Sequence, residues 1–483
     1  MKLIDLLSNV NVVKYACEQG TEITGVSYDS RKVEKGDAFV AITGYRTDGH
    51  KYISQALNKG AAVVVCETAP EGNVPYVLVA DSRLALAKMS DSFFGHPARS
   101  MTMVGVTGTN GKTTTTFLIK NILEQATGKR VGLMGTNVNI IGERELPAER
   151  TTPESYEVFR LLADMRDAGC EYAVMEVSSH ALELKRVYGI EFETAVFSNL
   201  SRDHLDFHET MEKYLKAKSK LFTMARFGVV NIDDPAAETI MQQGTCQFQT
   251  YSAKNDGADL VAKNINLKPD RVEFEAVVKG FINRISLGIP GMFSVYNALA
   301  ATGCCLTLGI PLTEISMAMK TAHGVKGRAE VVPVPADFTV LIDYAHSPDG
   351  IVNILKAVKG FAKGRVIALF GCGGDRDKTK RPLMGKAAAE LADFCIVTSD
   401  NPRNEDPRAI IEDILPGMKG SKTPMAVIDD RRAAIVYAME NAKPGDVVVL
   451  MGKGHETYQE IKGEKLHLDE REEVAKYFAG KTK

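Results

Sequence analysis

The stretch Gly105–Thr116, GVTGTNGKTTTT, decides the fold of this 483-residue chain. It follows the apolar, strand-forming run at residues 101–106 and leads directly into the helix-forming segment FLIKNILEQ at residues 117–125. Glycines let backbone amides approach phosphate oxygens, and the start of a helix adds a favourable partial charge. We therefore predict a triphosphate-binding loop in which Lys112 contacts the β- and γ-phosphates and the Thr113 hydroxyl faces a magnesium ion. The loop residues are Gly108, Thr109, Asn110, Gly111, Lys112, Thr113 and Thr114.

The spacing of this loop departs from the generic phosphate loop, which has glycine where this chain has Val106. A glycine- and threonine-rich turn that binds nothing is disfavoured by the strand before it, the helix after it and the lysine between them. A dinucleotide-binding loop is also disfavoured, because a lysine followed by hydroxyls suits a triphosphate and a metal ion. Motors, transporters and regulatory GTPases share such loops, so the reaction must be inferred from the rest of the chain.

Composition excludes several classes of function. The net charge is only -2, with 45% hydrophobic and 25% charged residues, so the basic footprint of a nucleic-acid-binding protein is missing. No apolar run approaches the roughly 20 residues of a membrane-spanning helix, and the first residues do not form a signal peptide. Eight scattered cysteines without a CxxC pair fit a reduced protein. We expect a cytoplasmic monomer with small-molecule substrates, no nucleic acid and no membrane insertion.

The order of apolar runs predicts an α/β fold with three domains. Residues 1–98 form a small α/β unit, and residues 99–330 form a phosphate-loop domain with a mostly parallel sheet. Residues 331–483 form a doubly wound, Rossmann-like domain. Residues 248–287 contain short alternating runs such as RVEFEAVV, which predict a β-rich insert before a helix at residues 292–309.

Strands are predicted where apolar runs alternate with helix-forming segments. In the phosphate-loop domain these runs are Tyr172–Val177, Thr194–Asn199 and Phe227–Asn231. In the last domain they are Phe338–Asp343, Arg365–Phe370, Phe394–Ser399 and Asp446–Met451. Ligands of such sheets bind beyond the carboxyl ends of the strands, so the residues that follow these runs are the candidates for a site.

Further motifs occur in a fixed order along the chain. They are TTPES (151–155), MEVSSHAL (175–182), SNLSRDHLDFHETMEKYLKAK (198–218), YNALAA (296–301), GRAE (327–330), DYAHSPD (343–349), FGCGGDRDKTKRPLMG (370–385), SDNPRNEDP (399–407) and GKGHE (452–456). Together with the loop GVTGTNGKTTT they resemble the Mur ligase family, which is related to folylpolyglutamate synthases. The resemblance spans the chain from its first domain to its last. It implies ATP-dependent formation of an amide bond in the synthesis of cell-wall precursors.

The resemblance implies a second metal site. Glu176 and His204 each follow a strand of the phosphate-loop sheet, and carboxylate and imidazole are plausible ligands of Mg²⁺. Singly, each is better explained as an ordinary strand-end acid or a hydrogen-bonded surface histidine. Lys218 matches the family lysine that is carbamylated, although its sequence context also fits a solvated helical lysine. His204 and His208 have the i, i+4 spacing of a zinc pair, but no HExxH frame or cysteine supports zinc, so His208 is assigned a structural or substrate-side role.

Four more positions match family residues that help to bind ATP. They are Asn297, Arg328, Asp343 and His346. Arg328 suits a phosphate clamp because a guanidinium is a rigid planar donor, although an interdomain salt bridge would explain it as well. With Lys112, Glu176, His204 and Lys218, it completes the predicted catalytic group.

Other positions match the residues that bind the nucleotide-linked substrate. Thr151, Thr152, Ser178 and Arg186 match contacts to a muramoyl dipeptide, whereas Leu184 stands where some relatives have a glutamine, so that hydrogen bond is not carried over. At the uridine diphosphate end the matching residues are Tyr28, Ser30, Tyr45, Arg46 and Thr47. Outside this context DSR and GYRTDG would be simple polar loops.

The pocket for the incoming amino acid is the most specific part of the resemblance. Asp400, Asn401, Pro402 and Arg403 follow a predicted strand, and the resemblance implies that DNPR marks enzymes that add meso-diaminopimelate. Diaminopimelate differs from lysine by a second carboxylate, which an arginine can bind with two hydrogen bonds. Alone, Arg403 would be an ordinary turn arginine. Arg376, Gly452 and Glu456 match the rest of this pocket.

The resemblance therefore implies a ligase that joins meso-diaminopimelate to the γ-carboxylate of UDP-N-acetylmuramoyl-L-alanyl-D-glutamate through an acyl phosphate. A lysine-adding ligase and a folylpolyglutamate synthase are the near alternatives, and DNPR and the long first domain argue against both. A phosphate-loop motor or regulatory NTPase is the distant alternative. The net charge, the absence of tryptophan and the Rossmann-like third domain disfavour it.

Overall fold

The computed structural model describes residues 1–44, 47–322 and 324–481, apart from the side chains of residues 206 and 481. It divides into two compact units, the first comprising Met1–Leu260 and Ala300–Ile315 and the second Val261–Leu299 and Ser316–Lys483. No helix in the described ranges is both long and apolar enough to cross a membrane. The predicted limits of three domains stay a prediction.

The first unit begins with a five-stranded sheet in the order β1-β5-β4-β3-β2. Strands β2 to β5 are parallel, and β1 is antiparallel to β5. Residues of β3, β4 and β5 pack on α1 and α3 in an apolar core. The strands are β1 Val12–Ala16, β2 Gly25–Ser27, β3 Asp37–Val40, β4 Val63–Cys66 and β5 Tyr76–Val79. The helices are α1 Leu3–Leu6, η1 Gly49–Tyr52, α2 Ile53–Asn58, α3 Ser82–Phe93 and η2 Pro97–Ser100.

A larger sheet in the same unit has the order β13-β12-β11-β6-β10-β7-β8-β9. The strands from β13 to β7 are parallel, and β8 and β9 add an antiparallel edge that the sequence did not predict. The strands are β6 Thr102–Thr107, β7 Val131–Met134, β8 Val138–Ile141, β9 Arg144–Pro147, β10 Tyr172–Glu176, β11 Phe192–Phe197, β12 Ala225–Asn231 and β13 Gln247–Ser252. The helices are α4 Lys112–Thr127, α5 Ser155–Asp167, α6 Ser179–Glu183, α7 Leu205–His208, α8 Met211–Ser219, η3 Lys220–Thr223 and α9 Ala236–Gln243.

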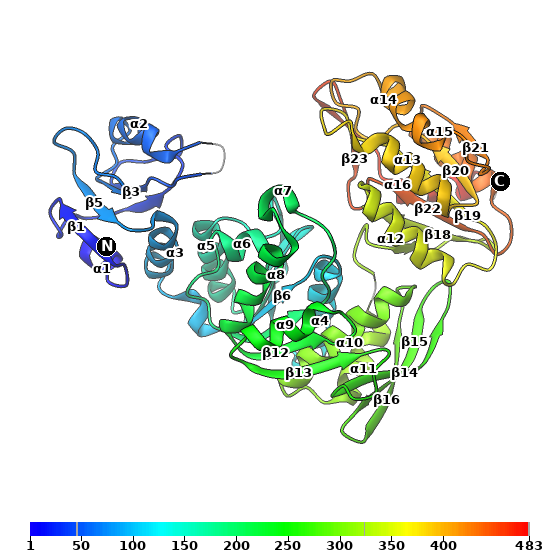
Figure 1. Ribbon diagram of the computed structural model, residues 1–483, viewed down its shortest axis with the longest axis horizontal. Helices are drawn as coiled ribbons and strands as arrows, with labels where there is room; N and C mark the ends of the chain where they lie inside the picture. Colours follow the sequence, from blue (N-terminus) through cyan, green and yellow to red (C-terminus); the bar gives the residue numbers. More distant parts are fainter. Residues whose placement is uncertain (45–46, 323, 482–483) are drawn as a thin grey trace. The chain divides into compact units, whose positions relative to one another are not determined.

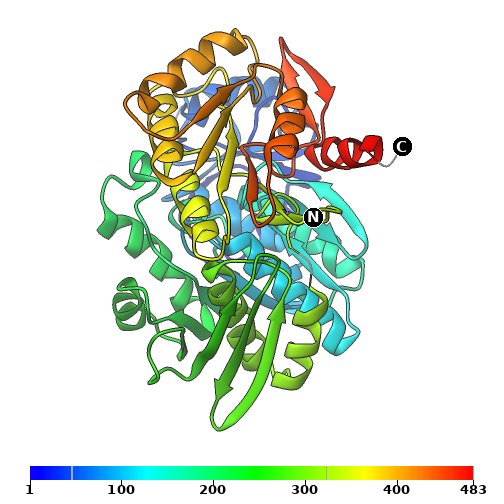
Figure 2. The ribbon, with the colours of Figure 1, turned by 90° about the vertical axis from the view of Figure 1, so that its right-hand side faces the viewer.

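The predicted β-rich insert is confirmed. It contains β14 Leu260–Leu267, β15 Val272–Val278 and β16 Phe281–Leu287, followed by the helices α10 Met292–Thr307 and α11 Leu312–Thr321. Strands β15 and β16 form an antiparallel hairpin, drawn in green at the bottom of Figure 2. In β15 every second residue is buried, which is the alternation expected of a sheet with one covered face.

The second unit contains a doubly wound sheet in the order β17-β18-β22-β19-β20-β21, in which only β17 is antiparallel to its neighbour. The strands are β17 Glu330–Val332, β18 Thr339–Asp343, β19 Val366–Phe370, β20 Phe394–Val397, β21 Met425–Val427 and β22 Val447–Met451. The helices are α12 Pro348–Lys359, α13 Lys380–Leu391, α14 Pro407–Ile414, η4 Leu415–Met418, α15 Arg431–Asn441 and α16 Glu470–Lys481. A separate hairpin consists of β23 Tyr458–Ile461 and β24 Glu464–His467. The predicted Rossmann-like fold is confirmed.

Helices cover both faces of this sheet. Helices α15 and α16 pack on one face, where their apolar side chains meet those of β18, β19 and β22. Helices α12 and α13, yellow in Figure 1, lie side by side. Ser347 caps α12 and Pro348 occupies its first turn, after which buried residues recur at i, i+3, i+4 and i+7. The carboxyl ends of β18, β19, β20 and β22 lead into the four polar loops that the sequence identified.

Candidate active site

The phosphate loop joins the end of β6 to the start of α4. Gly108 has φ +150° and Gly111 has φ +85°, conformations that L side chains rarely adopt. A Cβ atom on Gly108 would lie 1.9 Å from the Ser198 hydroxyl oxygen, so only glycine fits there. The Lys112 amine folds back over the loop and donates hydrogen bonds of 2.9 Å to the carbonyls of Gly108 and Thr109. The loop is thus preformed around its lysine.

Residues at the end of β11 brace this loop. The Asn199 side chain accepts from the Asn110 amide at 3.0 Å and donates to the Asn110 carbonyl at 3.0 Å. The Ser198 hydroxyl donates to the same carbonyl at 2.7 Å, and the Asn199 carbonyl accepts from the Thr109 amide. The bracing contacts of Ser198 and Asn199 were not predicted. Both residues directly follow a buried strand, but nothing in the sequence identifies Asn110 as their partner.

Lys218 lies against the same loop. Its side chain is 1% exposed and its amine donates to the Gly108 carbonyl at 2.8 Å. The amine also lies 4.4 Å from the centre of the Tyr214 ring. Burial, and then the neighbouring Lys112 charge, hold the pKa of Lys218 well below its usual value. The alternative of a solvated helical lysine is therefore wrong.

Tyr214 connects Lys218 to the phosphate loop. Its hydroxyl lies 3.2 Å from the Thr109 hydroxyl, and burial raises its pKa to about 12. Nothing in the sequence singled out Tyr214, since its place four residues before Lys218 also fits a core tyrosine.

Glu176 is buried at the end of β10. Its carboxylate accepts from the Thr136 amide at 2.8 Å and from the Thr136 hydroxyl at 2.9 Å, and that hydroxyl lies 3.0 Å from the Thr151 hydroxyl. A Cβ atom on Gly135 would lie 2.5 Å from the carboxylate. Within the described ranges, no three histidine, cysteine, aspartate or glutamate side chains are grouped closely enough to hold a metal ion.

His204 lies just before α7 with φ +54°, and its side chain is 43% exposed. Its ring packs edge-on against His180, with ring centres 4.9 Å apart. His208, in contrast, is buried, and its Nε2 lies 2.9 Å from the Ser179 hydroxyl oxygen. A buried histidine that hydrogen-bonds a serine supports the structural role assigned to His208.

The residues expected to contact the dipeptide are joined by hydrogen bonds. The Thr152 hydroxyl donates to the Glu176 carbonyl at 2.7 Å and accepts from the Ser178 amide at 3.1 Å. Arg186 donates to the Thr152 carbonyl at 3.0 Å and pairs with Glu154 at 3.3 Å. Burial lowers the pKa of Arg186. Four of the predicted residues, Thr151, Thr152, Ser178 and Arg186, are thus held in one area beside Glu176.

The residues expected at the uridine end lie among the loops of the first sheet. The Ser30 hydroxyl donates to Gln55 at 2.9 Å, and the Thr47 hydroxyl lies 3.2 Å from the Tyr52 hydroxyl. The Tyr28 hydroxyl donates to Glu157 at 2.9 Å, and burial raises the pKa of Tyr28. The remaining two predictions, Tyr45 and Arg46, lie outside the described residues.

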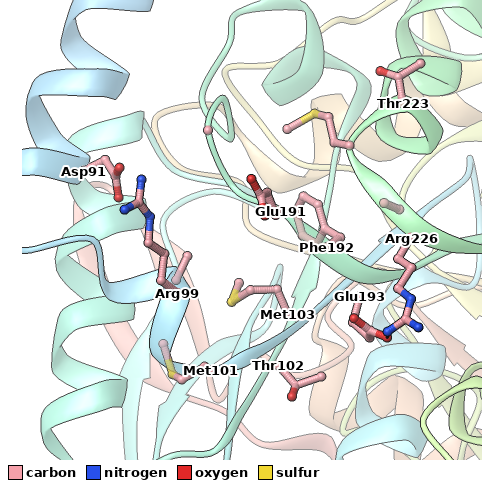
Figure 3. Close-up of a pocket in the computed structure, with 14 residues that line it drawn as sticks. Asp91, Arg99, Met101, Thr102, Met103, Glu191, Phe192, Glu193, Thr223 and Arg226 are labelled. Atoms are coloured by element: carbon pink, nitrogen blue, oxygen red, sulfur yellow. The ribbon is translucent and has the colours of Figure 1, made fainter. Parts of the chain in front are cut away.

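A pocket of about 550 Å³ lies at the amino ends of central strands of the large sheet (Figure 3). Its wall includes Thr102, Phe192 and Ala225, which begin or lie next to the start of β6, β11 and β12. Arg226 and Glu193, which pair at 3.1 Å, also line it. Because the phosphate loop follows the carboxyl end of β6, this pocket is not part of the phosphate site.

In the second unit, Arg328 and Asp343 lie where the GRAE and DYAHSPD loops meet. Asp343 accepts from the amides of Ala329 at 2.7 Å and Ala345 at 2.9 Å, and burial raises its pKa. The Arg328 guanidinium lies 5.3 Å from the centre of the Tyr344 ring, and its buried Nε has no hydrogen-bond partner within the described part of the chain. Such an unsatisfied donor suits an anionic ligand.

The other two predicted ATP residues differ in burial. His346 is exposed, with its Nδ1 2.7 Å from the Tyr344 carbonyl oxygen. Asn297 is buried on α10.

The residues predicted to bind the incoming amino acid lie on three loops of the second unit. A Cβ atom on Gly452, which has φ +112°, would lie 2.3 Å from an Asp400 carboxylate oxygen. A Cβ atom on Gly373 would lie 2.9 Å from Arg403 Nη1 and 3.8 Å from Arg376 Cγ. Both arginines therefore lie near Gly373, although 27 positions separate them in the sequence.

Arg403 is held in place by its backbone and its side chain. Its amide donates to the Glu460 carbonyl, and its φ is +51°. Its Nε pairs with the Glu460 carboxylate at 3.2 Å, and Nη1 donates to the Gly374 carbonyl at 2.8 Å. The alternative of an ordinary turn arginine leaves these long-range contacts unexplained. The hairpin β23–β24, which supplies Glu460, was not predicted from the sequence.

Asn401 and Glu456, which were predicted to contact the incoming amino acid, are joined by a hydrogen bond. The Asn401 amide group donates to Glu456 at 2.8 Å, and the same carboxylate oxygen accepts from the buried Lys453 amine at 2.9 Å. Asn401 was predicted, but the function of Lys453 was missed because GKGHE was interpreted only through Gly452 and Glu456.

Comparison with known proteins identifies the family of this chain. Residues 22–93 match the model of the Mur ligase family catalytic domain, residues 106–305 match the Mur ligase middle domain, and residues 327–454 match the Mur ligase glutamate ligase domain. The chain is 48% identical over 464 residues to UDP-N-acetylmuramoyl-L-alanyl-D-glutamate--2,6-diaminopimelate ligase of Clostridium botulinum, covering 95% of each chain.

Solved structures agree with this match. A structure of a UDP-N-acetylmuramoyl-L-alanyl-D-glutamate--2,6-diaminopimelate ligase has a TM-score of 0.74 and 33% identity, and it covers 100% of this chain and 99% of its own. MurF ligase from Thermotoga maritima in complex with ADP has a TM-score of 0.62 at 22% identity over 95% of this chain and 97% of its own, which supports the fold alone. The chain belongs to the Mur ligase family.

Proposed function

We propose that this protein joins meso-diaminopimelate to the D-glutamyl γ-carboxylate of UDP-N-acetylmuramoyl-L-alanyl-D-glutamate, with ATP as the energy source. The observation that carries the proposal is the placement of Arg376 and Arg403 close to Gly373, on loops of the second unit that lie near those of Asp400 and Glu456. The far end of diaminopimelate carries one carboxylate and one ammonium group. Two guanidinium groups and two carboxylates match that pair of charges.

ATP would bind at the phosphate loop. Its phosphates would accept from the amides of Gly108 to Thr114, and the Lys112 amine would exchange its two carbonyl partners for phosphate oxygens. Asn297, Arg328, Asp343 and His346 are the proposed contacts from the second unit. The unsatisfied Nε of Arg328 supports a contact to a negatively charged group.

Mg²⁺ would be held by Thr113, Glu176, His204 and a carbamate on Lys218. A hydroxyl, a carboxylate and a carbamate supply the oxygen ligands that Mg²⁺ prefers, and the ion would neutralise charge on the phosphates. Lys218 suits carbamylation because burial lowers the pKa of its amine, which favours the neutral form that reacts with carbon dioxide. The amine nitrogen would add to the carbon of carbon dioxide and release one proton to solvent.

Two chemical steps follow from this arrangement. An oxygen of the γ-carboxylate forms a bond to the γ-phosphorus of ATP while the bond to the β,γ-bridging oxygen breaks, which gives an acyl phosphate and ADP. The amine of diaminopimelate then attacks the acyl carbon and loses a proton, and the bond to phosphate breaks. Lys112 and Arg328 would stabilise the charge that develops during phosphoryl transfer.

We also propose that the dipeptide portion contacts Thr151, Thr152, Ser178 and Arg186, and that the uridine diphosphate contacts the loops around Ser30 and Thr47. The protein would act as a cytoplasmic monomer, since its nucleotide-linked substrate and ATP occur in the cytoplasm. Sedimentation velocity tests the monomer, and a stable dimer at micromolar concentration would contradict it.

The test is phosphate release by the purified protein with ATP, Mg²⁺ and UDP-N-acetylmuramoyl-L-alanyl-D-glutamate, with and without meso-diaminopimelate. Release that requires all of these substrates, together with a nucleotide product whose mass has increased by one diaminopimelate residue, supports the proposal. Release without the amino acid, or stimulation by nucleic acid, would instead point to another class of phosphate-loop protein. The variant Lys112→Ala is the control for contaminating ATPases.

A further inference from the structure

Lys453 is a lysine without solvent exposure beside the proposed amino-acid pocket. It follows Gly452 after the end of β22. Its amine donates to the Asn401 side-chain oxygen at 2.8 Å and to Glu456 Oε2 at 2.9 Å, and it lies 5.6 Å from the centre of the Tyr458 ring. A buried ammonium group is costly unless it is paired, so these two acceptors account for its position.

The contacts of Lys453 determine how Glu456 faces the pocket. Glu456 Oε2 accepts from both Lys453 and Asn401, which holds that oxygen in place. Within the described ranges, no hydrogen bond reaches Glu456 Oε1. That oxygen is therefore the available acceptor for the ammonium group of an incoming amino acid.

The same network extends to the arginine side of the pocket. The Asn401 side-chain oxygen accepts from Lys453 and also from the Glu460 amide at 2.9 Å. Glu460 in turn pairs with Arg403 through its carboxylate and accepts the Arg403 amide with its carbonyl. The buried Lys453 amine is thus connected to Glu456, which is proposed to accept from the substrate ammonium group. It is also connected to Arg403, which is proposed to donate to the substrate carboxylate.

We propose that Lys453 is a positioning residue that sets the distance between Glu456, which would bind the ammonium group, and Arg403, which would bind the carboxylate. This inference rests on the proposed function. Lys453 does not touch the substrate; it acts through Asn401 and Glu456. Another buried cation nearby, Arg431, pairs with Glu470 and donates to the carbonyls of Ser399 and Met451, so it holds strand ends. Lys453 differs because both of its acceptors are side chains.

The variant Lys453→Met keeps the length of the side chain and removes its charge and its hydrogen bonds. It should raise KM for diaminopimelate roughly tenfold or more, because the Glu456 carboxylate loses one of its two donors. The kcat value and the KM values for ATP and the nucleotide-linked substrate should stay within roughly twofold, since those groups bind elsewhere. Lys465→Met is the matched control, because its exposed amine lies over the same Tyr458 ring at 4.3 Å but outside the network.

Two further variants separate a positioning role from a structural one. Lys453→Gln retains a donor, so it should fold and show a smaller rise in KM for diaminopimelate. If Lys453 acts through Glu456, the double variant of Lys453→Met and Glu456→Gln should bind diaminopimelate no worse than Glu456→Gln alone.

An unchanged KM for diaminopimelate in Lys453→Met would overturn the inference while leaving the proposed function intact. Equal rises in KM for all three substrates would overturn it as well, and so would failure of both Lys453 variants to fold. In either case Lys453 would serve only to stabilise the fold. A wild-type protein without diaminopimelate-dependent turnover would sink the proposed function itself.

Discussion

Replacing Arg403 with alanine should remove the preference for diaminopimelate over lysine. A guanidinium group has five N–H donors, of which Arg403 uses one on Glu460 and one on the Gly374 carbonyl. Three donors remain on Nη1 and Nη2, and a substrate carboxylate can accept two of them side by side. Because Nε is already paired, the carboxylate must approach the Nη1–Nη2 edge.

The magnitude follows from those two hydrogen bonds. A hydrogen bond to a charged group contributes about 1.5–3 kcal/mol, and the Arg403 side chain is 20% exposed, so the lower part of that range applies. A combined loss of about 3–4 kcal/mol from the two bonds corresponds to a fall in kcat/KM for diaminopimelate of roughly 150- to 900-fold. Lysine has no second carboxylate, so its kcat/KM should change little.

The assay is phosphate release at varied diaminopimelate or L-lysine, with ATP and the nucleotide-linked substrate saturating. Arg403→Lys should lie between wild type and Arg403→Ala, because an ammonium group keeps the charge and loses the planar pair of donors. Arg408→Ala is the matched control, since Arg408 is exposed on α14 and pairs with Asp429. Equal losses for both amino acids in Arg403→Ala would refute the reasoning, because Arg403 would then not read the second carboxylate.

Three further perturbations test other parts of the account. Carbon dioxide depletion should lower wild-type turnover and added bicarbonate should restore it, whereas Lys218→Ala should be inactive under both conditions; a wild type indifferent to bicarbonate would argue against the carbamate. Gly452→Ala should raise KM for diaminopimelate, because its Cβ atom would lie 2.3 Å from the Asp400 carboxylate, and an unaltered KM would contradict that packing. Arg381 lowers the pKa of Glu405 to about 2 from 4.5, so Glu405 adds stability that is present above about pH 4.5 and is lost as the pH falls towards 2. Glu405→Gln should therefore lower the free energy of unfolding at pH 7, and the difference should shrink below pH 4.5; a constant difference in urea titrations across this range would disprove it.

The parts of the molecule that were predictable are those formed by residues contiguous in the sequence. The run from the strand ending at Thr107 to the helix starting at Lys112 is contiguous, so its pattern of apolar residues, glycines and lysine identifies the phosphate loop. The α/β class and the central strands of both large sheets, β6, β10, β11 and β12 in the first unit and β18, β19, β20 and β22 in the second, were predictable for the same reason. Asp400 and Arg403 were also identifiable, because polar residues directly follow a buried strand.

Contacts between distant segments were not predictable. The bracing of Asn110 by Asn199 spans 89 positions, and the bond from Lys453 to Asn401 spans 52. Neither residue type carries a signal by itself, since asparagines and lysines are common in polar loops. Strand β9 and the hairpin β23–β24 were missed because their short runs are exposed or only partly buried.

The most direct test of the central claim is a competition between substrates. The wild-type protein is incubated with ATP, Mg²⁺, UDP-N-acetylmuramoyl-L-alanyl-D-glutamate and equal concentrations of meso-diaminopimelate and L-lysine, and the nucleotide product is identified by its mass. The account predicts a product that carries diaminopimelate, formed with one phosphate released per molecule. A product that carries lysine, or phosphate release without any new amide bond, would contradict it.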